Sequence, residues 1–156
     1  MTEIDDVQQE MAAARAELLA ALVGTTAEEL ERRPPGEISD DERRWPIVDV
    51  LWHVGVIEDR FRRTIDQALD GRELTTDAPR TRPAHMTTLP LLLEWLDQSR
   101  RPTEVLLQRM NSADLAIEIP RPDGSTRTPA RFLAIIAGHD RQHAQQVRDL
   151  RALVDA

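Results

Sequence analysis

Two histidines, His139 and His143, are the residues of this chain whose types and spacing are best suited to chemistry. They lie four residues apart in the stretch AGHDRQHAQQV, so on a helix they share one face, with Cβ atoms about 5–6 Å apart. That spacing suits two imidazole ligands of one metal ion. The pair alone is a weak signal, because histidines at this spacing also occur in packed cores and on solvated faces. Whether the pair binds a metal ion depends on its place in the helical pattern and on the presence of a third ligand.

The segment 128–153 is predicted to form the helix that carries this pair. Thr128 suits an N-cap, and Pro129 suits the first helical position. Steps of three and four residues connect one stripe, whose members are Phe132, Ile136, His139, His143, Gln146, Leu150 and Leu153. A buried polar group without a partner costs about 1–3 kcal/mol. We therefore expect the three polar side chains of this stripe to have partners inside the protein.

A third candidate ligand, His53, lies in a second predicted helix that starts near Pro46 and runs to about Leu69. The apolar stripe of this helix consists of Ile47, Val50, Val54, Ile57, Phe61 and Ile65, and His53 borders it. His53 is therefore either a ligand that faces the HxxxH pair or a partly exposed histidine at the edge of the core.

Two glycines lie inside these helices beside the candidate ligands, Gly55 and Gly138. A glycine inside a helix costs about 0.5–1 kcal/mol relative to alanine, so each position calls for a reason. The glycines leave room either for an ion or substrate, or for the close packing of two helices.

Two more segments have helical periodicity, so the chain is predicted to be all-α, a four-helix bundle in a single domain over residues 1–156. One runs from Ile4 to Leu22, and the other covers 89–110, where Pro102 is expected to kink or interrupt the helix. The connection over 70–88 is about 19 residues long and could span the bundle, which predicts a crossover that leaves the second and third helices parallel. A short capped helical turn is expected at TAEEL, and a small hairpin within 111–128.

The stretch LWHVGVIEDRF, followed about 86 residues later by HDRQHAQQVRDLR, resembles the DinB/YfiT-like superfamily of four-helix bundles. The shared features are a histidine after an aromatic residue on the second helix, here Trp52 and His53, with an acidic residue soon after it, here Glu58. The fourth helix carries HxxxH, followed by Gln and Leu. The resemblance covers nearly the whole chain through the layout of its helices. It implies a divalent ion held at one end of the bundle by His53, His139 and His143.

The resemblance also implies a chemistry. Similar proteins hold Zn, Ni or Fe-type ions, and neutral imidazoles suit these metals, whereas Ca and Mg prefer oxygen ligands. Three protein ligands leave a position for water or substrate. Members with an assigned activity include S-transferases and maleylpyruvate isomerases that use a low-molecular-weight thiol, so the expected function is a metal-dependent thiol S-transferase or isomerase, or a hydrolase. Two alternatives stay open: a non-catalytic bundle that binds a metal or ligand, and a plain helical bundle without metal.

Three polar residues are candidates for orienting the ligands. Asp49 precedes His53 by one helical turn, and Gln146 shares the stripe of His143. Glu58 lies about 140° around the helix from His53, so it is a weaker candidate and could contact another helix instead. The fourth histidine, His85, lies in a polar loop without helical pattern and is not expected to be a ligand.

The composition narrows the class of partner. The net charge is −8, and the 20 basic residues are all arginines scattered among acids, a pattern that argues against nucleic acid. The chain has no cysteine, which excludes thiolate ligands and a cysteine nucleophile and fits a cytoplasmic protein. No apolar run approaches the roughly 20 residues needed to cross a bilayer, so no membrane is expected. The expected partners are a small-molecule substrate and, since dimers are common among similar proteins, a second copy of the chain.

Overall fold

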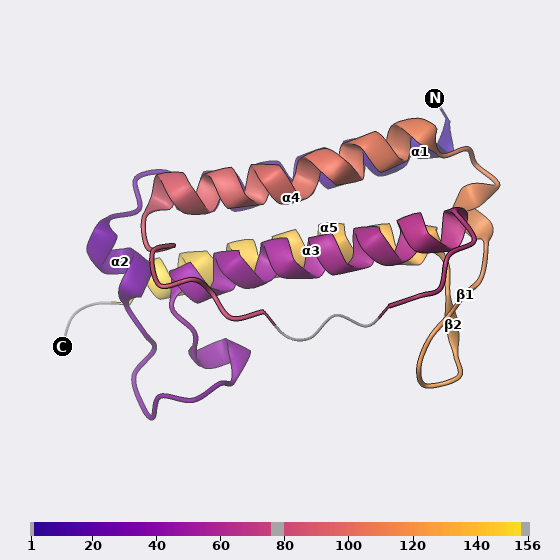
Figure 1. Cartoon of the computed structure of the whole chain (residues 1–156). Helices are drawn as coiled ribbons and strands as arrows, with labels where there is room; N and C mark the ends of the chain where they lie inside the picture. The colour runs from indigo at the N-terminus through magenta and orange to yellow at the C-terminus, as the bar shows by residue number, and fades with distance from the viewer. Residues whose placement is uncertain (1, 76–79, 154–156) are drawn as a thin grey trace.

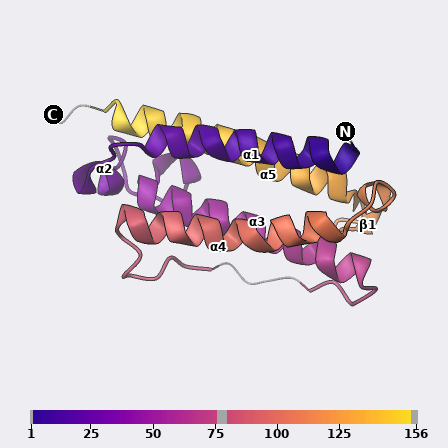
Figure 2. The ribbon, with the colours of Figure 1, turned by 90° about the horizontal axis from the view of Figure 1, so that it is seen from above.

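Four long helices pack side by side in the computed structural model, which describes residues 2–75 and 80–153 (Figure 1). They are α1 (Glu3–Leu22), α3 (Ile47–Leu69), α4 (Leu89–Arg109) and α5 (Pro129–Arg151). The two views place α1 against α5 and α4 against α3, so the bundle has a roughly square section (Figures 1 and 2). The predicted all-α four-helix bundle is therefore confirmed.

The short elements connect the long helices. Within the described residues they are α2 (Ala27–Glu31), the 3-10 turns η1 (Glu42–Arg44) and η2 (Asp114–Ala116), and the strands β1 (Ile119–Pro120) and β2 (Thr126–Arg127). The helical turn expected at TAEEL is α2, which Thr26 begins with a capping box. The hairpin expected within 111–128 is the antiparallel pair of β1 and β2, and residues 114–116 of that segment form η2 instead.

The helix starts follow from capping residues. The Thr2 hydroxyl accepts from the backbone N–H of Asp5, and the Asp5 carboxylate accepts from Thr2 in return. At α5 the Thr128 hydroxyl accepts from the N–H of Arg131 at 3.1 Å, as the sequence predicts. Pro46 is the N-cap residue of α3, one position before its first helical residue.

The crossover between α3 and α4 is confirmed. Near the starts of the two helices, Trp52 stacks on Trp95 with ring centroids 4.4 Å apart. At their far ends, Arg109 of α4 donates to Asp66 and Asp70 at 2.9 and 3.0 Å. Start meets start and end meets end, so the two helices run parallel (Figure 1). Residues 76–79 of the connection, like residues 1 and 154–156, lie outside the described part of the chain.

The sequence predicts that Pro102 kinks or interrupts its helix; the interruption is wrong, and the kink stays a prediction. Helix α4 runs continuously from Leu89 to Arg109 and includes Pro102. Proline removes one backbone hydrogen bond and crowds the preceding turn. The flanking residues Ser99 and Thr103 are nonetheless buried against the other helices, so tertiary packing holds the helix together across the missing bond.

Gly55 allows α3 and α4 to approach closely. A Cβ at this position would lie 2.1 Å from Nε1 of Trp95 and 2.8 Å from the hydroxyl oxygen of Ser99. The indole N–H of Trp95 lies over the glycine and donates to the backbone oxygen of Trp52 at 3.1 Å. Gly55 therefore serves the close packing of two helices and does not leave room for an ion or substrate.

Four buried charged side chains, one from each long helix, meet in the core. Arg15 of α1 pairs with Glu58 of α3 at 2.9 Å and with Asp140 of α5 at 3.0 Å. Arg100 of α4 pairs with the same two carboxylates at 2.7 and 2.9 Å. We call these four residues the buried charge quartet. Its formal charges sum to zero, and every pair in it joins two different helices.

The faces that point to solvent are mainly polar. Among the described residues, the exposed large apolar side chains are Leu19, Val23, Ile38 and Val105. None of the described helices combines the length and the apolar character needed to cross a membrane.

Candidate metal site

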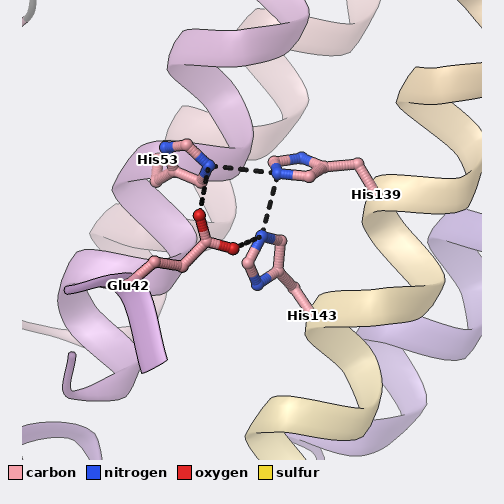
Figure 3. Close-up of side chains that lie close together, drawn as sticks. All are labelled: Glu42, His53, His139 and His143. Carbon is pink, nitrogen blue, oxygen red and sulfur yellow. Dashed lines mark hydrogen bonds and ion pairs between the residues drawn. The ribbon is translucent and has the colours of Figure 1, made fainter. Parts of the chain in front are cut away.

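Two long helices and the turn before α3 bring four side chains to one point (Figure 3). His53 comes from the second turn of α3, His139 and His143 come from successive turns of α5, and Glu42 comes from η1. One potential ligand atom from each of the four lies within 4.8 Å of all the others. The structure therefore brings together the three histidines that the sequence singles out and adds a carboxylate.

The imidazole nitrogens are close enough to share an ion. Nε2 of His139 lies 3.0 Å from Nε2 of His53 and 2.9 Å from Nε2 of His143. For a tetrahedral zinc ion with Zn–N bonds of about 2.0–2.1 Å, the ligand nitrogens are about 3.3 Å apart. The observed separations need only small side-chain adjustments to reach that geometry.

Gln146 determines which nitrogen of His143 faces the cluster. The side-chain amide of Gln146 donates from Nε2 to the backbone oxygen of Glu42 at 2.8 Å, so its oxygen must face the other way. That oxygen lies 2.7 Å from Nδ1 of His143 and can only accept, so Nδ1 carries the proton. The Nε2 lone pair of His143 therefore points into the cluster, as a metal ligand requires.

The environment keeps the three imidazoles neutral. Burial, together with the nearby His143 and His53, lowers the pKa of His139 to about 3. Burial is also the main cause that lowers the pKa of His53, and it lowers the pKa of His143 against the opposing effects of Gln146 and Glu42. Because a metal competes with protons for the same lone pairs, three neutral imidazoles at pH 7 are ready to bind one.

The fourth member, Glu42, was not found by sequence reasoning. Its carboxylate oxygens lie 3.4 Å from Nε2 of His143 and 3.8 Å from Nε2 of His53. In the sequence Glu42 is one of several acids in the stretch SDDERR, and nothing in that stretch distinguishes it. The residues present fit a divalent transition ion, since three convergent neutral imidazoles and one carboxylate are a donor set that such ions prefer.

Comparisons with known proteins agree with this architecture. A family model, described as the DinB superfamily, matches residues 10–147. The chain belongs to the DinB superfamily. No match was found among curated proteins.

Solved structures of similar fold match over nearly the whole chain. A conserved protein from Enterococcus faecalis matches at 16% identity with a TM-score of 0.68, over 97% of this chain and 96% of that one. TT2238, described as a four-helix bundle protein, matches at 19% identity with a TM-score of 0.64, over 96% and 99%. The colibactin self-resistance protein ClbS, solved in complex with double-stranded DNA, matches at 10% identity with a TM-score of 0.74, over 99% of both chains. At these identities the likeness establishes the fold alone.

The other residues that the sequence nominated in this DinB-superfamily chain have different places. Gln146 contacts His143, as described above. Asp49 instead accepts from Arg82 at 2.7 Å, and no contact joins it to His53 among the described residues. Glu58 points away from the cluster into the buried charge quartet, the contact with other helices that its position favours. His85 is exposed and lies outside the cluster.

The glycine beside His139 differs from Gly55. Gly138 is exposed, and a Cβ there would meet no atom within 4 Å. Helix packing therefore does not account for Gly138, because the space around its Cβ position is open.

Proposed function

We propose that this DinB-superfamily chain is a metal-dependent enzyme, in which His53, His139 and His143 hold a divalent transition ion such as Zn, Ni or Fe. The observation that supports the proposal is the convergence of three neutral imidazoles, with Nε2 separations of 2.9 and 3.0 Å around His139. The favoured reactions are transfer or isomerisation with a low-molecular-weight thiol, or hydrolysis. A divalent ion at this point would lower the pKa of a thiol or water that it binds.

The chain's own residues supply orientation and a proton acceptor. Gln146 holds His143 in the tautomer that directs Nε2 inward. The Glu42 side chain is 37% exposed, so it can rotate, and its carboxylate faces the same point as the imidazoles. It is placed to accept the proton that an incoming thiol or water loses.

Glu42 also supports the alternative of a non-catalytic metal-binding or ligand-binding bundle. If its carboxylate bound the ion, three nitrogens and one oxygen would complete four-coordination and close the site, as in structural zinc centres. The two functions therefore differ in the part that Glu42 plays.

Elemental analysis of protein purified without an affinity tag tests the metal. We expect about one equivalent of one transition metal, and we expect His139→Ala to abolish tight binding. His85→Ala is the matched control, because it removes an exposed histidine outside the cluster and should leave the metal content unchanged. Less than about 0.1 equivalent, with no uptake on titration, refutes the ligand set.

A second comparison separates the enzyme from the closed site. In the cobalt-loaded protein, a thiolate-to-metal charge-transfer band on addition of a low-molecular-weight thiol supports thiol activation. Glu42→Gln should leave the metal content near one equivalent if Glu42 accepts a proton, and should lower metal affinity strongly if Glu42 is a ligand. The absence of a band for every physiological thiol tested favours hydrolysis or simple binding.

The proposed partners follow the same reasoning. A small-molecule substrate is proposed, and nucleic acid is not, because the net charge of −8 opposes a polyanion. The DNA in the ClbS complex belongs to a protein that is 10% identical. A cytoplasmic location and a homodimer are part of the proposal, and the mass of the protein in solution tests the dimer.

A further inference from the structure

A hollow of about 630 Å³ opens beside His53, and residues of α3 between Asp49 and Arg60 form part of its lining. Trp45, Trp52 and Ile57 contribute apolar surface to its wall, and the Trp45 ring meets the His53 imidazole edge-on at 5.1 Å between centroids. The volume is in the range of small-molecule sites, which are commonly apolar with a few polar groups that fix the ligand. Its contact with His53 makes the hollow the natural place for a substrate of the proposed metal centre.

The charge of this hollow is positive. Its lining contains four arginines and two aspartates, namely Arg33, Arg60, Arg80, Arg82, Asp40 and Asp49. Most of these charges already have partners. Arg82 donates to Asp49 at 2.7 Å, Arg33 lies 3.9 Å from the same carboxylate, and Arg80 donates to Asp59 at 2.8 Å.

Among the four arginines of the hollow, Arg60 is the exception. It forms no ion pair with any carboxylate among the described residues, and its Nε is buried without a hydrogen-bond partner there. A guanidinium group that lines a hollow without an ion-pair partner can bind a ligand carboxylate there.

The position of Arg60 directs it toward the metal site. His53, Ile57 and Arg60 follow one another at steps of four and three residues, so they share one face of α3. Seven residues of helix span about 10 Å, and side chains on a helix lean toward its N-terminus, here toward His53. A small molecule can therefore reach from Arg60 to the histidine cluster.

We propose that Arg60 binds the carboxylate of a small organic acid whose apolar part lies against Trp45 and Ile57 and whose reacting atom reaches the histidine cluster. A single unpaired guanidinium matches a single carboxylate, which it can bind through two parallel hydrogen bonds. This inference rests on the proposed function for the reaction, but the binding itself needs no metal. It narrows the substrate of the proposed enzyme to carboxylic acids.

Benzoate and benzamide are suitable probes, because they share a flat ring and a similar size but only benzoate carries a charge. The indole N–H signals of ¹⁵N-labelled protein report binding, since Trp45 and Trp52 line the hollow. We expect benzoate to shift these signals saturably, in metal-free and metal-loaded protein alike, with at least tenfold higher affinity than benzamide. Arg60→Gln should reduce benzoate affinity at least tenfold and leave benzamide binding unchanged.

Two further variants control the test. Arg131→Gln removes the same charge from the exposed first turn of α5, and it should bind benzoate like the native protein. Arg60→Lys keeps the positive charge but loses the forked geometry of the guanidinium group. Its affinity for benzoate should therefore lie between those of the native protein and Arg60→Gln. Equal affinities for benzoate and benzamide, or benzoate binding by Arg60→Gln within twofold of native, overturn the proposal. Metal content is measured on the same samples as a separate test. A protein that binds no metal refutes the proposed function, whereas benzoate binding by the same protein still supports the carboxylate site at Arg60.

Discussion

Replacing Glu58 by glutamine tests what the buried charge quartet contributes to the fold. Glu58 is 1% exposed, and its two carboxylate oxygens accept from Arg15 at 2.9 Å and from Arg100 at 2.7 Å. The substitution keeps the shape of the side chain but removes its charge. Two buried guanidinium groups then share the single carboxylate of Asp140, and the glutamine amide turns a donor toward a cation.

The expected loss of stability is large. Breaking a buried ion pair by removing one partner costs about 3–5 kcal/mol, because the remaining charge is buried without compensation. Domains have unfolding free energies of about 5–15 kcal/mol, so Glu58→Gln should remove a substantial fraction. For a chain of this size each kcal/mol corresponds to about 2–4 °C, so the midpoint of thermal unfolding should fall by about 6–20 °C.

Urea unfolding and thermal melts followed by circular dichroism measure this change. Glu17→Gln is the matched control, since Glu17 also pairs across two helices, with Arg141 at 2.7 Å, but its side chain is 53% exposed. An exposed pair is worth about 0–1 kcal/mol, so this variant should melt close to the native protein.

The double variant Glu58→Gln with Arg100→Gln tests the reasoning about charge. It restores electrical balance in the quartet, so its loss should be smaller than the sum of the two single losses. If Glu58→Gln unfolds within about 1 kcal/mol of the native protein, or if the two losses simply add, charge balance does not stabilise this core.

Two other predictions follow from the site. Because the folded-state pKa of His139 is about 3, below the usual His value near 6.5, the unfolded chain binds more protons between these values. The unfolding free energy of the metal-free protein should therefore fall as the pH falls from about 6.5 toward 3, and that of His139→Asn should fall less. If urea unfolding gives the two proteins the same dependence of unfolding free energy on pH, this prediction is wrong. Gly55→Ala should destabilise the protein by about 1–3 kcal/mol because the new Cβ clashes with Trp95, whereas Gly138→Ala should stabilise it by up to about 1 kcal/mol. If Gly55→Ala has the higher melting temperature of the two variants, Gly55 is not required for close helix packing.

The helices could be predicted because their signals are local. Thr128 and Pro129 mark the start of α5 in the sequence, and the apolar spacing from Ile4 to Leu22 marks α1, since capping and periodicity depend only on neighbours along the chain. The stripe assigned to α5 was less accurate. His143 is fully buried, but His139 lies at the edge of the buried face, and Asp140 lies inside it. A stripe shifted by one residue toward the C-terminus contains Leu133, Ala137, Asp140, Ala144 and Val147, which are all buried.

The buried charge quartet had a signal that sequence reasoning did not use. Arg15 follows Met11 by four residues and precedes Leu18 by three, so it occupies the apolar stripe of its helix, and Arg100 holds the same position between Leu96 and Thr103. A charged residue on such a stripe predicts a buried partner. Which partner it takes depends on how the helices are arranged around the bundle axis, and no local pattern contains that arrangement.

The sequence by itself determined the helices, the crossover, and the three histidines as candidates, because caps, periodicity and residue type are properties of short segments. Only the tertiary structure decided that His53 meets the HxxxH pair, because their contact joins residues 86 positions apart. It also decided the use of Glu42 and Arg60. Glu42 reaches the cluster from the 3-10 turn η1, whose path is set by packing. Arg60 is distinguished from the other three arginines of the hollow by the ion pair that it lacks among the described residues.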